Sequence, residues 1–128
     1  MPFMKRAVLE IMVDNMKESI HWYTEILGFK VNISSPETNP VFTSLSNGDV
    51  EIMLYKREEF SKEIPKFKDM KTGGSFVLYI TVEDIQKLYD SVKNKVKIIQ
   101  ELYTTDYGSM EFALEDPNDY VLMFNQAN

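Results

Sequence analysis

The sequence predicts an α+β fold built from two tandem βαβββ modules, and three observations predict it. The chain repeats itself, because one constant offset carries Val8 onto Val77 and Tyr23 onto Val92. Each copy opens with an extended apolar run that leads into a helical pattern. Each copy then closes with three further extended runs, the last two of which are separated by a tight turn.

The first module begins at the apolar run AVLEIMV, residues 7–13. Asp14 or Asn15 then offers a helix N-cap, and Gly28 is the residue type that ends such a helix. The apolar positions between them fall on one helix face: Met16, Ile20, Tyr23 and Leu27. Three extended runs complete the module: residues 29–33, 41–46 and 50–55.

The second module repeats this order. SFVLYITV (75–82) leads through Glu83-Asp84 into a second helix, whose apolar face holds Ile85, Leu88, Tyr89 and Val92. Its extended runs are residues 96–103, 109–115 and 120–125. We therefore expect one domain, residues 1–128, made of module 1 (6–55), a linker (56–74) and module 2 (75–126).

The linker is charged and ends on a pair of glycines. Phe60, Ile64 and Phe67 recur at helical spacing, which predicts a short helix that lies across a partner chain. Pro65 fits such a helix only in its first turn, because proline has no amide hydrogen to donate.

Bulk properties exclude several classes of function. The 128 residues carry a net charge of −6, whereas nucleic-acid binding needs a basic surface. The absence of cysteine from the sequence excludes disulfides, thiolate metal sites and cysteine nucleophiles. No apolar run is long enough to span a membrane, and the start of the chain has no signal-peptide core. We therefore expect a cytoplasmic protein without nucleic-acid or membrane partners.

Three segments resemble the vicinal oxygen chelate superfamily, which includes glyoxalase I, extradiol dioxygenases and bleomycin resistance proteins. They are SIHWYTEILGFKV (19–31), YITVEDIQKLYDSV (79–92) and YGSMEFALEDPNDYVLMF (107–124). The resemblance implies that each module curls a mixed sheet around a cavity, with the helices on the outside. It also implies a homodimer, because two modules from different chains often complete the cavity. Asp119 departs from the glycine usual in the family, which suggests a different turn geometry.

The resemblance also implies where a metal would be held in members that have one. Those positions here are Val8, Met53, Val77 and Met123. Valine offers no donor atom, and a thioether suits soft ions rather than the hard divalent metals of this superfamily. His21, the sole histidine, falls on the first helix, where a solvated side chain is expected. We therefore expect neither a metal nor another cofactor.

Strand alternation selects the residues that would face the cavity. The Asn47-Gly48 pair predicts a two-residue hairpin turn that places Phe42 opposite Met53. Alternate side chains share a face, so the strands separate an apolar face from a mixed one. The mixed face supplies the predicted ligand wall: Glu10, Met12, Phe42, Glu51, Met53, Tyr55, Tyr79, Glu111 and Met123.

Two functions fit this wall. The first is a metal-free protein that sequesters an aromatic, cationic small molecule, because methionines and aromatic rings adapt to such ligands and carboxylates attract positive charge. The alternative is a divalent-metal lyase, isomerase or dioxygenase of the same superfamily, with the glutamates as oxygen ligands. Because the inherited metal positions carry no suitable donor, the sequence favours binding over catalysis and predicts no catalytic residue.

Overall fold

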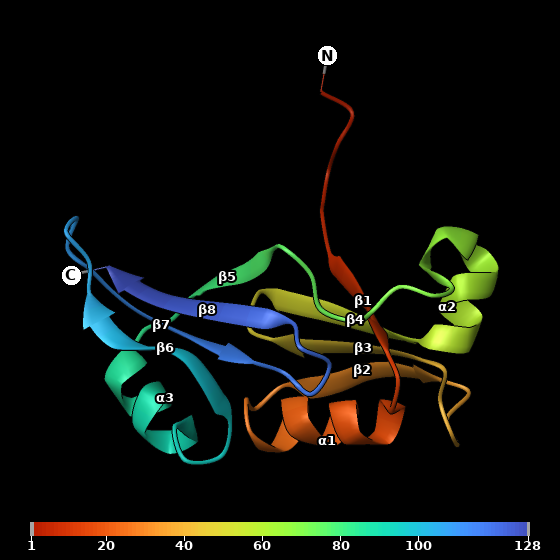
Figure 1. Ribbon diagram of the computed structural model, residues 1–128, viewed down its shortest axis with the longest axis horizontal. Helices are drawn as coiled ribbons and strands as arrows, with labels where there is room; N and C mark the ends of the chain where they lie inside the picture. Colours follow the sequence, from red (N-terminus) through yellow and green to blue (C-terminus); the bar gives the residue numbers. More distant parts are fainter. Residues whose placement is uncertain (1, 128) are drawn as a thin grey trace. The chain divides into compact units, whose positions relative to one another are not determined.

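The computed structural model describes residues 2–127 and contains two similar runs of elements (Figure 1). The first run is β1 (Leu9–Val13), α1 (Met16–Glu25), β2 (Lys30–Ser35), β3 (Phe42–Asn47), β4 (Val50–Lys56), α2 (Arg57–Glu63) and the 3-10 turn η1 (Pro65–Phe67). The second run is β5 (Val77–Thr81), α3 (Ile85–Val92), β6 (Lys97–Thr104), β7 (Ser109–Glu115) and β8 (Val121–Ala127).

Each run forms its own four-stranded mixed sheet. The first sheet has the strand order β1-β4-β3-β2 and the second has β5-β8-β7-β6. In both sheets the first strand of the module pairs in parallel with the last, and the other pairs are antiparallel. The predicted α+β class and the repeated βαβββ order are therefore confirmed. Neither sheet closes on itself, because each keeps two edge strands.

The described chain divides into two compact units. The first unit holds residues up to 24 and 28–70, and therefore includes α2 and η1 as well as the first sheet. The second unit holds residues 25–27 and the chain from 71 onward, which includes the second sheet. Each unit has a core of its own.

Both long helices begin at a side-chain cap. The Asn15 Oδ1 atom accepts a hydrogen bond from the Glu18 amide at 3.0 Å, so Asn15 and not Asp14 is the cap of α1. In the same way, Asp84 Oδ1 accepts from the Lys87 amide at 3.2 Å and caps α3. These bonds satisfy main-chain donors that the first turn of a helix leaves without partners.

The hairpin between β3 and β4 differs from the prediction by two residues. Asn47 pairs with Val50, so the loop residues are Gly48 and Asp49 rather than Asn47 and Gly48. Gly48 has φ +58, and glycine at the first loop position is typical of a type II′ turn. Phe42 consequently lies opposite Tyr55 and not opposite Met53. A shift of two residues leaves every side chain on its predicted face, because strand side chains alternate with a period of two.

The apolar faces of the sheets form the two cores. In the first unit the buried strand residues include Ile11, Val13, Leu45, Ile52 and Leu54. In the second unit they include Ile80, Phe112, Leu114, Leu122 and Phe124. Figure 1 shows α1 along the first sheet and α3 against the second, and Tyr23 of α1 and Val92 of α3 are among the most buried side chains.

The linker does not form one continuous helix. Ile64 takes an extended conformation with φ −128 and ψ 90, which separates α2 from η1. Proline disfavours helical backbone in the residue before it, and Pro65 then starts η1 at the position where a missing amide hydrogen costs nothing. Figure 1 shows α2 on the opposite side of the first sheet from α1. The segment therefore packs within its own unit.

Gly73 lies against the turn before β8 and leaves no room for a side chain. Asp119 takes φ +67, a left-handed conformation that aspartate adopts more readily than most residues. A Cβ atom built on Gly73, which has φ +93, would lie 2.9 Å from the main-chain oxygen of Asp119. This close approach requires glycine at position 73.

Gly73→Ala is expected to lower the free energy of unfolding by about 1–3 kcal/mol. The added methyl group would strain the backbone at its positive φ and would also collide with the main-chain oxygen of Asp119. Gly48→Ala is the control, since Gly48 also has a positive φ but a Cβ there meets nothing within 4 Å. Chemical denaturation of both variants measures the difference. Equal losses in the two variants would show that the contact with Asp119 contributes nothing.

Among residues 2–127, none of the helices has the length and apolar character that crossing a bilayer would require.

Candidate functional site

Six of the nine predicted ligand-wall residues share one face of the first sheet. Glu10 pairs with Met53 and Met12 pairs with Tyr55 across the parallel β1–β4 ladder. Residues paired in this way point to the same side of a sheet. Strand alternation and the pairing of Phe42 with Tyr55 complete the mixed face of the first sheet: Glu10, Met12, Phe42, Glu51, Met53 and Tyr55.

The other three lie on the corresponding face of the second sheet. Tyr79 pairs with Met123, and Glu111 pairs with Asn125 two positions along β8. Tyr79, Glu111 and Met123 therefore make up the predicted part of the mixed face of the second sheet. The predicted wall thus consists of two groups, one in each compact unit.

The charge of Glu51 is already compensated within the first unit. Arg6, which precedes β1, forms an ion pair with Glu51, and Ser44 Oγ donates a hydrogen bond to Glu51 Oε2 at 3.1 Å. Sequence patterns miss Arg6 because it belongs to no strand. Glu51 is therefore held by a cation of its own chain.

Glu10 is partly buried on the same face. Burial, and then the nearby carboxylate of Glu63, raise the pKa of Glu10 above its ordinary value. Glu63 also raises the pKa of Tyr55, first through a hydrogen bond and then together with burial. Glu63 belongs to α2, so the predicted linker contributes to the mixed face of the first sheet.

Aromatic rings continue from this face onto α2. Phe42 meets Tyr55 edge-on with ring centroids 5.9 Å apart, and Tyr55 lies 5.5 Å from Phe60 of α2. Phe60 in turn stacks on Phe67 at 5.0 Å. The regular spacing of Phe60 and Phe67 in the linker indicates that both side chains pack against other residues, but it does not indicate which surface they contact. We call Phe42, Tyr55, Phe60 and Phe67 the aromatic cluster.

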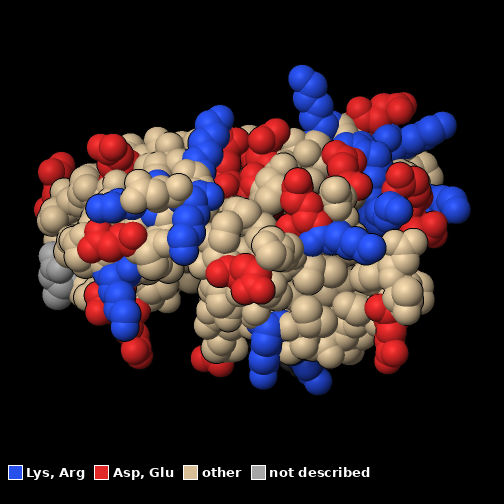
Figure 2. All heavy atoms as spheres, turned by 90° about the horizontal axis from the view of Figure 1, so that it is seen from below, with Lys and Arg blue, Asp and Glu red and all other residues tan. Residues whose placement is uncertain are grey.

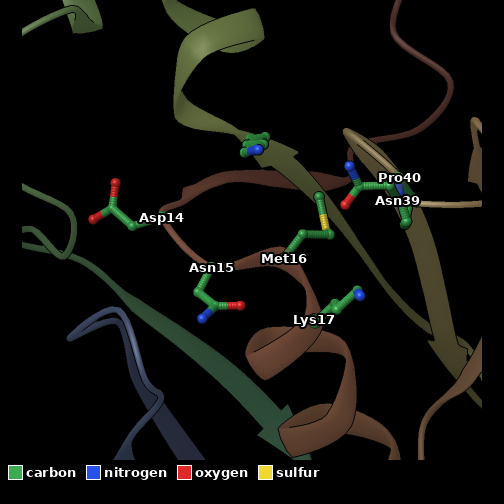
Figure 3. A pocket seen from close by; sticks show the side chains of 7 residues that line it. Asp14, Asn15, Met16, Lys17, Asn39 and Pro40 are labelled. Atoms are coloured by element: carbon green, nitrogen blue, oxygen red, sulfur yellow. The ribbon is translucent and has the colours of Figure 1, made fainter.

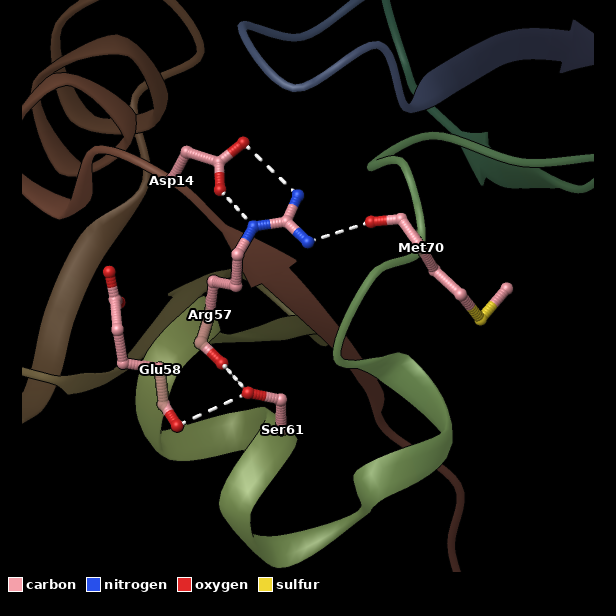
Figure 4. Close-up of polar contacts among 5 residues, drawn as sticks. All are labelled: Asp14, Arg57, Glu58, Ser61 and Met70. Atoms are coloured by element: carbon pink, nitrogen blue, oxygen red, sulfur yellow. Dashed lines mark hydrogen bonds and ion pairs between the residues drawn. The ribbon is translucent and has the colours of Figure 1, made fainter.

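An ion pair fixes the start of α2 (Figure 4). Arg57 Nε donates to Asp14 Oδ1 at 2.5 Å, and Arg57 Nη2 lies 3.4 Å from Asp14 Oδ2. Arg57 Nη1 also donates to the main-chain oxygen of Met70 at 2.7 Å. Arg57 therefore joins the end of β1, the start of α2 and the chain beyond η1.

Glu111 accepts two hydrogen bonds on the mixed face of the second sheet. The hydroxyl of Tyr79 donates to Glu111 Oε2 at 2.6 Å and that of Tyr107 donates to the same oxygen at 3.0 Å. Its hydrogen bond to Glu111, followed by burial, raises the pKa of Tyr79 from 10.0 to about 12. Sequence reasoning missed Tyr107, which lies in the turn between β6 and β7, four residues before Glu111.

Tyr79 is expected to titrate with a pKa of about 12. Because this value lies above that of an unfolded tyrosine, the stabilising contribution is complete below pH 10 and is lost as the pH rises through 12. The ultraviolet absorbance of tyrosinate, measured against pH, tests this. The latest-titrating component should disappear in Tyr79→Phe, and a curve unchanged by that substitution would contradict the assignment.

The side chains at the four positions implied for a metal do not fit a hard divalent ion. Met53 lies between Glu10 and Ser44 in the register, and Met123 lies between Tyr79 and Ala113. The other two positions are valines, which have no donor atom. Within residues 2–127, no three histidine, aspartate or glutamate side chains come together as a metal site would require.

A pocket of about 280 Å³ lies elsewhere in the first unit (Figure 3). It lies at the start of α1, and none of the nine predicted residues lines it. Its lining residues are Asp14, Asn15, Met16, Lys17, Asn39, Pro40 and Lys56.

On the face seen in Figure 2, acidic and basic side chains of the described residues are interspersed rather than gathered by sign.

Comparison with known proteins places this arrangement in a family. The sequence model of the Glyoxalase/Bleomycin resistance protein/Dioxygenase superfamily matches residues 5–124. The uncharacterized protein YraH of Bacillus subtilis (strain 168) is 30% identical over 95 residues, which are 72% of this chain and 73% of that protein.

Solved structures share the fold. A protein of unknown function from Agrobacterium tumefaciens str. C58 has a TM-score of 0.81 at 17% identity, over 100% of this chain and 98% of that chain. TnmS3, an antibiotic binding protein from Streptomyces sp. CB03234, has a TM-score of 0.70 at 17% identity, over 97% and 98%. Likeness at such identities shows the fold, whereas the family match spans nearly the whole sequence. The chain belongs to the Glyoxalase/Bleomycin resistance protein/Dioxygenase superfamily.

Proposed function

We propose that the protein binds an aromatic small molecule without a metal ion and sequesters it, in the manner of bleomycin resistance proteins. The observation that carries the proposal is the position of Met53. It occupies a position at which the family resemblance implies a metal ligand, yet it offers a thioether between Glu10 and Ser44. A flexible, polarisable side chain there suits contact with a ligand better than coordination of a hard ion.

The aromatic cluster supports the same proposal. Its rings extend from the mixed face of the first sheet onto α2 and lie within contact distance of one another. Ligand sites are commonly made of apolar and aromatic side chains with a few polar groups, and Glu10 and Ser44 supply such groups beside Met53. TnmS3, which has the same fold, is an antibiotic binding protein, and this likeness also favours binding over catalysis.

The experiment uses 1-naphthylmethanol, a neutral aromatic probe, on protein treated with a chelator. Calorimetric titration is expected to show binding that the chelator does not change. Met53→Glu should weaken this binding by roughly tenfold or more, about 1.4 kcal/mol, because the apolar probe would have to desolvate a carboxylate. Met4→Glu is the control, since Met4 lies exposed before β1.

Metal analysis provides the second arm of the test. Protein purified without chelator should carry no stoichiometric ion, and zinc, nickel, manganese or iron(II) should leave its melting temperature unchanged. One tightly held ion per chain, or binding that disappears with the chelator, would overturn the proposal in favour of a metal-dependent enzyme. Absence of any aromatic binding would overturn it as well.

A further inference from the structure

Glu111 is a buried carboxylate without a cation of its own. Its residue is 3% exposed. Two carboxylates on the mixed faces do have a cationic partner. Arg6 forms an ion pair with Glu51, and Lys97 Nζ lies 3.2 Å from Glu115 Oε2. Among residues 2–127, no lysine, arginine or histidine forms an ion pair with Glu111. A buried charge is costly unless it is paired or well hydrogen-bonded, so the hydrogen bonds of Glu111 determine how well its charge is compensated.

The hydrogen bonds of Glu111 leave one of its oxygens open. Both phenol hydroxyls, from Tyr79 and Tyr107, donate to Oε2. No donor among the described residues reaches Oε1. Among residues 2–127, every fully buried side-chain oxygen or nitrogen has a hydrogen-bond partner. Because Oε1 of Glu111 has none, it must be in contact with solvent. The carboxylate is therefore buried on one side and can accept a hydrogen bond on the other.

The two tyrosines present their rings at the surface beside this oxygen. Tyr79 is 52% exposed and Tyr107 is 75% exposed, although both hydroxyls are engaged with Glu111. Aromatic faces attract cations, and exposed rings also offer a surface on which an aromatic group can stack. The three residues come from β5, from the β6–β7 turn and from β7, so the sheet brings them together.

We propose that Glu111 anchors an organic cation that carries an N–H bond, such as a primary or secondary ammonium or a guanidinium group. Oε1 accepts the hydrogen bond from the ligand nitrogen, and the rings of Tyr79 and Tyr107 contact the adjoining aromatic part. All three residues belong to the second unit, whereas Met53 belongs to the first, so this anchor is a further binding site and goes beyond the proposed function. A hydrogen bond between opposite charges is stronger than one between neutral groups, so a protonated nitrogen satisfies this site better than a hydroxyl.

The requirement for N–H gives a sharp test with three matched probes. They are 1-naphthylmethylamine, its N,N,N-trimethylammonium analogue and 1-naphthylmethanol. The amine is expected to bind at least about tenfold more tightly than the other two, because the quaternary ion has charge without a donor and the alcohol has a donor without charge. Glu111→Gln should remove that preference and leave the affinity for the alcohol unchanged.

Glu115→Gln is the matched control, because Glu115 lies on the same face of β7 but is paired with Lys97. It should keep the preference for the amine. The tyrosinate titration gives a readout independent of affinity, because Glu111→Gln should lower the pKa of Tyr79 from its raised value.

The outcomes separate this inference from the proposed function. If all three probes bind equally, or if Glu111→Gln keeps the preference, the anchor is overturned while metal-free binding of aromatic molecules stands. If none of the probes binds, both are overturned. Loss of the preference in Glu115→Gln as well would show a general effect of surface charge, which also overturns a specific anchor.

Discussion

Replacing Phe124 by alanine is expected to lower the free energy of unfolding by about 3–5 kcal/mol, the range for truncating a buried aromatic side chain. Phe124 is buried on the apolar face of β8 and stacks on Phe112 with ring centroids 5.1 Å apart. Phe112 in turn meets Tyr89 of α3 edge-on at 5.0 Å. Truncation would leave a cavity between the second sheet and its helix, which neighbouring side chains fill only in part.

Met123→Ala is the matched comparison, since Met123 precedes Phe124 on the same strand and points to the mixed face. It should cost clearly less in the same denaturation experiment. Phe3→Ala should cost almost nothing, because Phe3 is 83% exposed. A larger loss in Met123→Ala than in Phe124→Ala would mean that the two faces of β8 are assigned the wrong way round.

Tyr23→Ala is expected to have an effect of similar size in the first unit, about 3–5 kcal/mol on the scale of other aromatic truncations. Tyr23 is almost fully buried on α1. Its ring meets that of Phe29 edge-on at 5.6 Å, and its main-chain oxygen accepts a hydrogen bond from the Phe29 amide at 3.0 Å. The substitution removes the ring that packs α1 against the start of β2.

His21 provides the control on the same helix. It lies exposed on α1, as the sequence predicts for a solvated histidine. His21→Ala should therefore change the free energy of unfolding by less than about 0.5 kcal/mol. If the two variants lost stability equally, the buried face of α1 would have to be reassigned.

The faces of the strands could be predicted because they depend on alternation alone. Leu54 and Phe124 are buried while Met53 and Met123 are only partly so, as the patterns of β4 and β8 predict. This prediction survived a two-residue error in the hairpin register, since an even shift changes partners but not faces. Local periodicity therefore identifies the apolar faces, but it does not predict that Met12 and Glu111 on the mixed faces are buried as well.

The partners of the polar side chains could not be predicted in the same way. Arg6 reaches Glu51, and Tyr107 reaches Glu111, from segments outside the strand patterns. Long side chains on irregular segments make such contacts through three-dimensional proximity, which periodicity does not encode. The position of α2 was missed for a related reason, because the spacing of Phe60 and Phe67 shows that they pack but not on what.

The shortness of α2 has a dynamic consequence. A helix of seven residues is far below the length at which an isolated helix is stable in water. Its order depends on the packing of Phe60 against Tyr55 and on the bonds from Arg57 to Asp14 and Met70. Such a segment unfolds locally at a low free-energy cost. The amide hydrogens of α2 should therefore exchange with solvent before those of β4. A ligand that contacts Tyr55 and Phe60 would then slow that exchange, so hydrogen exchange at the α2 amides would measure binding to the mixed face of the first sheet.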